Sequence, residues 1–350
     1  MPVSPAPAPL SRVTRGGTVE SVHYGHVAVV DRDGGLLFAA GDPLALTFTR
    51  SALKPFQALP LVMAGGIERF GFSRQQVALL CASHSGEPRH IDAVADMLAK
   101  SGGNAAELQC GAHAPGFYEV AHVPPPPPPY SPLAHNCSGK HTGMLACCAL
   151  HGWSKRDYLA PSHPLQREIR QAVAGYTGVP DRELVEGIDG CSAPNFAVPL
   201  ANLAWAYARL VAGGDDAGGR ASLRLVDAMA AHPEMVSGER RNDLAFMRAG
   251  RGDWVTKIGA EGVQAIGVRS RGWGIALKVA DGHARGLHPA SVAVLAQLGL
   301  LDAAQRRALE CWESPAVRNI RGIVTGDIVP SVVLDKQDRR LEARHALVQE

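Results

Sequence analysis

The chain has 350 residues, with 35 lysines and arginines against 33 aspartates and glutamates and a formal net charge of +2. This balance excludes a polycation that coats nucleic acid and gives no sign of an acidic tail. Apolar residues make up 46% of the chain and charged residues 19%. No apolar run approaches the ~18 residues of a membrane span. The composition is therefore typical of a globular protein that is neither disordered nor membrane-spanning.

The first residues, Met1 to Pro9, are rich in proline and alanine and lack both the charged start and the apolar core of a signal peptide. We therefore expect residues 1–17 to form a flexible extension and the protein to be cytoplasmic. Residues 18–350 contain no internal repeat and no second compositional regime, which predicts a single domain.

Seven cysteines, an odd number in a chain too long to need disulfide bonds, are expected to be reduced. Cys81, Cys147 and Cys148 stand among alanine, leucine and methionine, which predicts core positions. Cys137 and Cys191 stand in surroundings rich in glycine and serine, which are typical of loops at a site.

Taken in chain order, the first predicted element is a β-hairpin from His23 to Gly41, with a turn at Asp31-Arg-Asp-Gly-Gly. A helix is predicted to begin near Ser51, with Pro55 in its first turn. Apolar periodicity predicts further helices over residues 73–80, 88–100, 139–150, 163–176, 196–211 and 221–232.

Six consecutive prolines at positions 124–129 predict a polyproline II spacer on the surface. Three short apolar segments at 254–259, 263–268 and 273–279 predict a meander of strands. A closing helix over 288–301 and a last strand within 320–334 complete the chain. The predicted fold class is α+β, with an N-terminal hairpin, a helical insertion and a C-terminal meander.

Two features could place a serine beside a lysine. Ser51 and Lys54 are one helical turn apart, so a desolvated lysine amine could take the serine proton. Ser83 interrupts an apolar run, and Lys257 lies on a predicted strand two residues before Gly259, whose small size lets a ligand approach. The alternatives are an N-cap serine with a solvated lysine, a cap before the helix at 88, and a solvated strand lysine. Because lysines are only 7 of the 35 basic residues, a lysine in an apolar stretch favours the functional interpretation.

Two further clusters, at residues 135–143 and 187–195, combine glycine with cysteine and polar side chains. The Gly139-Lys-His-Thr sequence lacks the spacing of a phosphate-binding loop. Two thiols in separate loops could instead bind zinc, although neither loop contains a C-x-x-C pair.

Five blocks of sequence, in this order, resemble the Rhizobium etli type of L-asparaginase, often labelled asparaginase II, along most of residues 20–335. The blocks lie at residues 50–57, 82–88, 135–144, 187–195 and 254–262. The resemblance implies a serine β-lactamase or glutaminase-like fold, in which an antiparallel sheet is flanked by helices. It also implies a homodimeric amidohydrolase, a hydrolase that converts L-asparagine to L-aspartate and ammonia and has zinc near its site.

The resemblance also assigns the residues of the site. Ser51 with Lys54, and Ser83 with Lys257, become two catalytic Ser-Lys pairs, in which we favour Ser51 as the nucleophile and Ser83 as a proton relay. The zinc ligands map onto three residues: Cys137, Lys140 and Cys191. Lysine binds a metal only as the neutral amine, which costs a proton at neutral pH.

The remaining assignments concern the substrate. A guanidinium matches a carboxylate, so Arg50 is expected to bind the α-carboxylate and Asp189 the α-ammonium. His84, Glu87 and His141 are further candidate substrate ligands. The expected partner is the small-molecule substrate L-asparagine, and no binding to nucleic acid or to a membrane is expected.

Two alternative functions remain open. One is a β-lactamase-like or penicillin-interactive serine hydrolase, against which the missing export signal argues. The other is a zinc-dependent regulatory or scaffold protein that uses Cys137 and Cys191 without turning over an amide.

Overall fold

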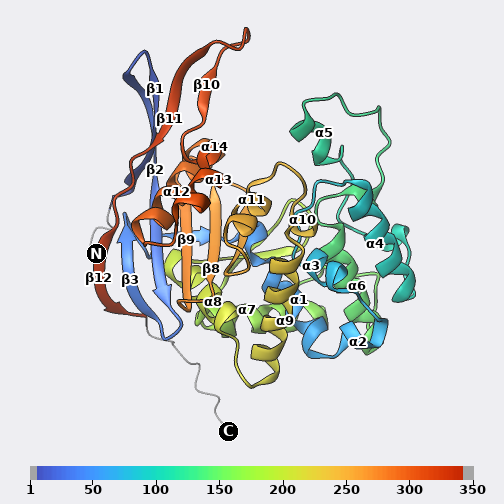
Figure 1. Ribbon diagram of the computed structural model, residues 1–350. Coiled ribbons are helices and arrows are strands. Elements are labelled where there is room, and N and C mark those ends of the chain that lie inside the picture. The colour runs from blue at the N-terminus through green and yellow to red at the C-terminus, as the bar shows by residue number, and fades with distance from the viewer. Residues whose placement is uncertain (1–5, 342–350) are drawn as a thin grey trace. The chain divides into compact units, whose positions relative to one another are not determined.

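The computed structural model describes residues 6–341 and is shown in Figure 1. The chain divides into two compact units. Among the described residues, the first unit contains residues 6–52, Val198–Arg209 and residues 249–341, and the second contains Leu53–Ala197 and Leu210–Arg248. The sequence predicted a single domain over residues 18–350. Every helix within the described residues is too short or too polar to cross a membrane.

An antiparallel nine-stranded sheet forms the frame of the first unit. Its main path runs β10-β11-β1-β2-β9-β8-β7, and β3 pairs with both β2 and β12. Figure 1 shows this mixture of blue N-terminal and orange to red C-terminal strands. The strands are β1 (Ala8–Arg15), β2 (Thr18–Asp31), β3 (Gly35–Ala40), β7 (Trp254–Gly259), β8 (Val263–Val268), β9 (Trp273–Val279), β10 (Ala316–Arg318), β11 (Val324–Pro330) and β12 (Asp335–Arg340). Strand β4 (Leu46–Phe48) also belongs to this unit.

Strand β1 corrects the expectation of a flexible N-terminal extension over residues 1–17. Its residues pair with β2 on one side and with β11 on the other, where Ser11 lies opposite Pro330. Leu10 and Val13 are fully or almost fully buried, so the burial of apolar side chains holds this segment on the sheet. Residues 1–5, which the prediction also covered, lie outside the described residues.

The predicted hairpin and meander are confirmed. Strands β2 and β3 pair with Val27 opposite Ala40, and β7, β8 and β9 form consecutive antiparallel pairs. Helix α8 (Leu200–Ala212) packs closely on β9, since a Cβ atom at Gly274 would lie 1.7 Å from the carbonyl oxygen of Ala204. The other helices of the first unit are α12 (Ala284–Gln297), α13 (Ala303–Ala308) and α14 (Glu310–Glu313).

The helix predicted over residues 196–211 begins later than expected. Residues Pro194–Pro199 form strand β6, and α8 starts at Leu200. Proline disfavours the helical conformation of the residue before it, so Val198 stays extended in front of Pro199. Strand β6 pairs antiparallel with β5 (Val185–Ile188).

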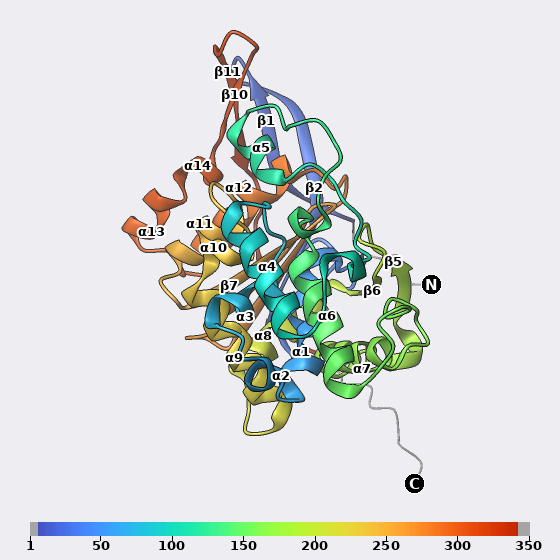
Figure 2. The ribbon, with the colours of Figure 1, turned by 90° about the vertical axis from the view of Figure 1, so that its right-hand side faces the viewer.

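The second unit is mainly helical, and Figure 2 shows α1, α3, α4, α6 and α7 in blue to green. Its helices are α1 (Lys54–Met63), α2 (Gly66–Phe70), α3 (Arg74–Leu80), α4 (Pro88–Lys100), α5 (Gly116–Ala121), α6 (Ser138–His151), α7 (Pro164–Thr177), α9 (Ala217–Ala231) and α10 (Pro233–Val236), with α11 (Asn242–Ala249) at its boundary. The predicted helices at 73–80, 88–100, 139–150, 163–176 and 221–232 are thus confirmed within a few residues. The α+β class is confirmed as well.

Two glycines bring α6 against α3. A Cβ atom at Gly139 would lie 2.4 Å from the carbonyl oxygen of Leu79, and one at Gly143 would lie 2.6 Å from a methyl group of Leu80. Only glycine permits so close an approach. The contact places the first turn of α6 beside the end of α3, from which the chain continues into Ser83. The proline run at 124–129 is exposed and lies outside any helix or strand, as predicted.

Candidate functional site

A buried lysine lies beside a buried serine in the second unit. The Lys54 side chain begins α1, and its Nζ atom is 2.9 Å from Ser83 Oγ, 2.5 Å from the carbonyl oxygen of Ala82 and 3.5 Å from that of Asn136. Lys54 is 1% exposed and Ser83 is 4% exposed. The amine and the hydroxyl are therefore within proton-transfer distance in an environment that excludes bulk water.

This burial decides between the alternative interpretations of three residues. Lys54 is not a solvated lysine, and Lys257, on β7, is fully buried as well. Ser83 does not cap the helix that follows, because Glu87 is the N-cap residue of α4. The hydrogen bond therefore joins the lysine of one predicted pair to the serine of the other, Lys54 to Ser83. The assignments of Ser51 to Lys54 and of Ser83 to Lys257 stay predictions.

Ser51 lies in a constrained turn of the first unit. It belongs to the 3-10 helix η1 (Arg50–Leu53). Arg50, the first residue of this helix, has a φ of +48°, a left-handed conformation that is costly for a residue with a side chain. The buried Tyr207 hydroxyl donates a 2.7 Å hydrogen bond to the carbonyl oxygen of Ala52. This bond fixes the turn that carries the predicted nucleophile.

Strand β7 supports the same turn within the first unit. A Cβ atom at Gly259 would lie 2.9 Å from the carbonyl oxygen of Thr49 and 3.2 Å from the Cβ atom of Arg50. The sequence predicted that Gly259 lets a ligand approach, whereas in the structure Thr49 and Arg50 of the same unit lie against it. The Lys257 amine donates to the carbonyl oxygen of Ile258 at 2.8 Å.

Replacing Tyr207 by phenylalanine is expected to lower the free energy of unfolding by about 1–3 kcal/mol, because the buried Ala52 carbonyl loses its donor. The freed turn should also lower kcat more than it changes KM. Urea denaturation and ammonia-release kinetics measure the two effects. Tyr24→Phe is the control, since Tyr24 is 47% exposed and surface changes stay within about 0.5 kcal/mol. Equal stability of the two variants would contradict the role of Tyr207.

Two thiols and an amine converge at the start of α6. Lys140 Nζ lies 2.9 Å from Cys191 Sγ, and Cys137, Lys140 and Cys191 are each at most 4% exposed. A hydrogen bond with Cys191 is the main cause that lowers the pKa of Cys137 well below its usual value, and Lys54 and Lys140 add to it. Burial lowers the pKa of Lys140, but the two cysteines outweigh burial and raise it overall.

These three side chains fit three positions of a tetrahedral zinc site, because two sulfurs and one nitrogen are donors that zinc accepts. Within residues 6–341, no set of three or more histidine, cysteine, aspartate or glutamate side chains could hold a metal ion. A site here thus depends on the lysine as a ligand. The half-buried Asp189 lies beside it, with Oδ2 4.0 Å from Cys191 Sγ.

The three further candidate substrate ligands already have hydrogen-bond or ion-pair partners within the protein. His84 accepts the Gly86 N–H at Nδ1 and lies 2.9 Å from Ser138 Oγ through Nε2. Glu87 accepts the Glu239 N–H at 2.8 Å and pairs with a neighbouring arginine. His141 is fully buried, and burial is the main cause that lowers its pKa to about 4. Their roles toward a substrate stay predictions.

We expect the free energy of unfolding to depend on pH because His84 is buried. Burial, with help from His90 and Lys54, lowers the pKa of His84 well below its usual value, so the folded protein keeps the ring neutral. In the unfolded chain the ring takes a proton below about pH 6.5, so the free energy of unfolding should fall as the pH drops through this value. Urea denaturation at pH 7.5 and 5.5 measures this loss. It should be smaller in His84→Gln; an unchanged loss would show that other groups cause it.

Two residues that contribute to the candidate site could not be identified from sequence motifs. The backbone carbonyl of Asn136 accepts from both Lys54 and the His84 N–H, and a carbonyl leaves no signature in a sequence. Tyr158 contacts His141 at 2.7 Å and lies outside every predicted block. His135, in the third block, accepts the Cys137 N–H at 3.0 Å, and its pKa is lowered to about 4 by burial, His113 and Lys54.

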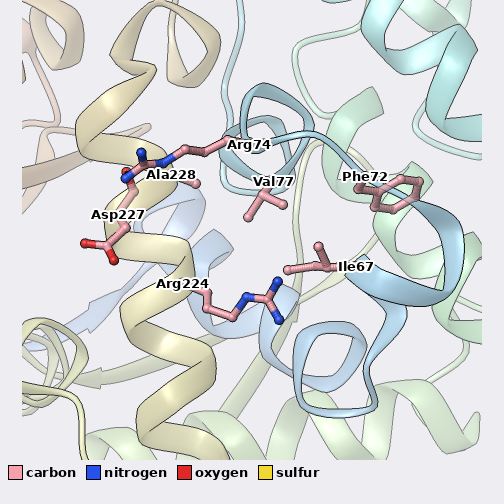
Figure 3. Close-up of a pocket in the computed structure, with 7 residues that line it drawn as sticks. All are labelled: Ile67, Phe72, Arg74, Val77, Arg224, Asp227 and Ala228. Atoms are coloured by element: carbon pink, nitrogen blue, oxygen red, sulfur yellow. The ribbon is translucent and has the colours of Figure 1, made fainter.

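A separate pocket of about 280 Å³ lies in the second unit, between α2, α3 and α9 (Figure 3). Arg74 donates to the carbonyl oxygen of Asp227 at 3.1 Å, and Arg224 pairs with Glu68. Both guanidinium groups therefore already bind protein oxygens. None of the predicted site residues, all of which lie within the described part of the chain, lines this pocket.

Comparison with solved structures finds distant likenesses. Mglu in its glutamate form is 17% identical, with a TM-score of 0.34 over 80% of this chain and 62% of that chain, so the present chain spans less than two thirds of Mglu. A β-lactamase from Mycobacterium bovis is 13% identical, with a TM-score of 0.34 over 78% of this chain and 94% of that chain. At TM-scores this low, neither structure supports a conclusion about this chain.

Comparison by sequence gives a more direct result. No curated protein matches the chain. The family model for L-asparaginase II matches residues 11–330, a range that includes both units and every predicted site residue. The chain therefore belongs to the L-asparaginase II family.

Proposed function

We propose that this amidohydrolase is an L-asparaginase, which hydrolyses L-asparagine to L-aspartate and ammonia. The observation that carries the proposal is the buried contact between Lys54 and Ser83 in a chain of the L-asparaginase II family. We further propose that the enzyme is a homodimer, as the resemblance of its sequence implies, and that it is cytoplasmic.

The surroundings of Lys54 suit a group that gains and loses a proton. A neutral amine has two N–H donors and one lone pair. The carbonyls of Ala82 and Asn136 can accept the two N–H groups, while the lone pair accepts the Ser83 hydroxyl proton. The protonated amine donates to the same three oxygens. Either state keeps every hydrogen bond, so proton transfer requires no rearrangement of the site.

In the mechanism that we propose, Ser51 Oγ attacks the side-chain amide carbon of L-asparagine. Its proton passes through Ser83 to Lys54, and Lys54 returns a proton to the leaving nitrogen as the C–N bond breaks and ammonia departs. Water then cleaves the ester and releases L-aspartate. The 2.9 Å contact supports Lys54 as the group that exchanges the relay's proton. Lys257 is proposed to assist Ser83.

The other groups bind and orient the substrate. Arg50 is proposed to hold the α-carboxylate as a bidentate partner, and Asp189 the α-ammonium. Cys137, Lys140 and Cys191 would hold zinc, which when bound supplies a local positive charge and an open ligand position. His84, Glu87 and His141 are proposed as further residues that bind the substrate.

Assays of the full-length protein test the function. We expect ammonia release from L-asparagine and no hydrolysis of nitrocefin, with L-glutamine as a second amide substrate for comparison. Nitrocefin hydrolysis without ammonia release would instead favour the β-lactamase-like alternative. Inactivity toward all three compounds in a folded, metal-supplemented sample would contradict the proposal.

A further inference from the structure

The loop that carries Ser83 is hydrogen-bonded to the end of α10. Helix α10 lies beside α3, and the chain leaves α3 into the loop of residues 82–87 (Figure 1). The last carbonyls of a helix have no partner within the helix, and two carbonyls at the end of α10 find their partners in this loop. The Val236 carbonyl accepts the Ser83 N–H at 2.8 Å. The Ser237 carbonyl accepts the Ser85 hydroxyl at 2.9 Å.

Both hydrogen bonds are shielded from bulk water. Ser85, Val236 and Ser237 are at most 1% exposed, and Ser83 is 4% exposed. A buried carbonyl that loses its donor is strongly unfavourable, because water cannot replace the lost bond. Without the Ser85 hydroxyl, the Ser237 carbonyl would therefore have to move toward another donor. The Ser85 side chain thus fixes the backbone at the end of α10.

The turn that follows α10 fits closely against the same loop. Gly238 has a φ of +113°, and a Cβ atom there would lie 2.7 Å from Ser85 Oγ and 2.5 Å from Glu87 Oε1. Only glycine permits both this conformation and this approach. On its other side the turn is joined to the next helix, because the Leu244 N–H donates to Ser237 Oγ at 3.2 Å. The turn is therefore a fixed support for the loop.

We propose that Ser85 is a positioning residue for Ser83. Its bond to the Ser237 carbonyl also fixes the preceding carbonyl, that of Val236, because the two peptide groups are planar and share one Cα atom. The fixed Val236 carbonyl holds the Ser83 N–H, which keeps the Ser83 hydroxyl 2.9 Å from Lys54 Nζ. A displacement of about 1 Å at a reacting contact can lower a rate ~100-fold. The proposal rests on the proposed function, in which this contact transfers a proton.

Amide hydrogen exchange of the full-length protein tests the anchor without an assay of activity. In the wild type the Ser83 N–H should exchange slowly, because it is buried and bonded. Ser85→Ala should speed this exchange about 10-fold or more relative to the amides of α7. The matched control is Ser222→Ala, which removes a fully buried hydroxyl that donates to the Gly219 carbonyl at 2.9 Å in α9 and should leave this ratio unchanged. A Ser83 N–H that exchanges freely in the wild type overturns the proposal, whether or not a variant folds.

Steady-state kinetics with L-asparagine provide the second test. Ser85→Ala should lower kcat about 10-fold or more and leave KM within about 2-fold, because the proton transfer acts in the transition state and not in substrate binding. Ser85→Cys keeps a weak donor and should give an intermediate kcat, while Ser222→Ala should keep both constants. Equal kcat in Ser85→Ala and Ser222→Ala overturns the proposal. A wild type that releases no ammonia contradicts the proposed function, while the exchange at Ser83 still decides whether Ser85 anchors the loop.

Discussion

Replacing Lys54 by methionine is expected to lower kcat for L-asparagine at least ~10³-fold, which corresponds to about 4 kcal/mol of activation barrier. Methionine keeps the length and apolar stem of the side chain but removes the proton carrier 2.9 Å from Ser83 Oγ. Ser83→Ala should show a loss of similar size, because it removes the other end of the same transfer. Ammonia release at saturating L-asparagine measures both variants.

The control for this prediction is Lys100→Met, which removes an exposed lysine of α4 that pairs with Asp96. This variant should keep wild-type kcat. Ser51→Ala completes the series and should be the least active serine variant if Ser51 is the nucleophile. Near-normal turnover in Lys54→Met, with folding verified by circular dichroism, would remove the proton-transfer role of this contact.

Gly139→Ala is expected to lower the free energy of unfolding by about 1–3 kcal/mol and to reduce kcat as well. Its Cβ atom would meet the Leu79 carbonyl oxygen at 2.4 Å, a backbone atom that cannot turn aside, so α3 and α6 must separate. The same carbonyl accepts the Ala82 N–H in the turn that leads to Ser83. The strain therefore reaches the Lys54–Ser83 contact directly.

Gly175→Ala is the matched control for Gly139→Ala. It makes the same chemical change in α7, where no atom lies within 4 Å of the added Cβ. Because alanine favours a helix by up to about 1 kcal/mol over glycine, this variant should be unchanged or more stable. Urea denaturation of both variants checks the pair. Equal effects in the two positions would show that the close approach of α3 and α6 does not matter.

Local patterns were sufficient for most elements of secondary structure. The hairpin of β2 and β3 and the meander of β7 to β9 follow from short apolar runs between turn residues, and α7 follows from apolar periodicity. Strand β1 was not predicted. Its proline-rich start indicates an extension, but β2 pairs with one edge of β1 across the Gly16-Gly17 turn, and β11, some 300 residues later, pairs with the other edge.

The sequence alone determined the family resemblance, through five blocks whose residue types and order are read without any structure, and with it the set of residues to inspect. The tertiary structure alone decided that Lys54 meets Ser83, 29 residues away in the chain, and that Ser85 meets Ser237. The physical reason is that a hydrogen bond depends on distance and burial in space. Here those are set by long-range packing of helices, such as the approach of α6 to α3 at Gly139, which no local pattern records.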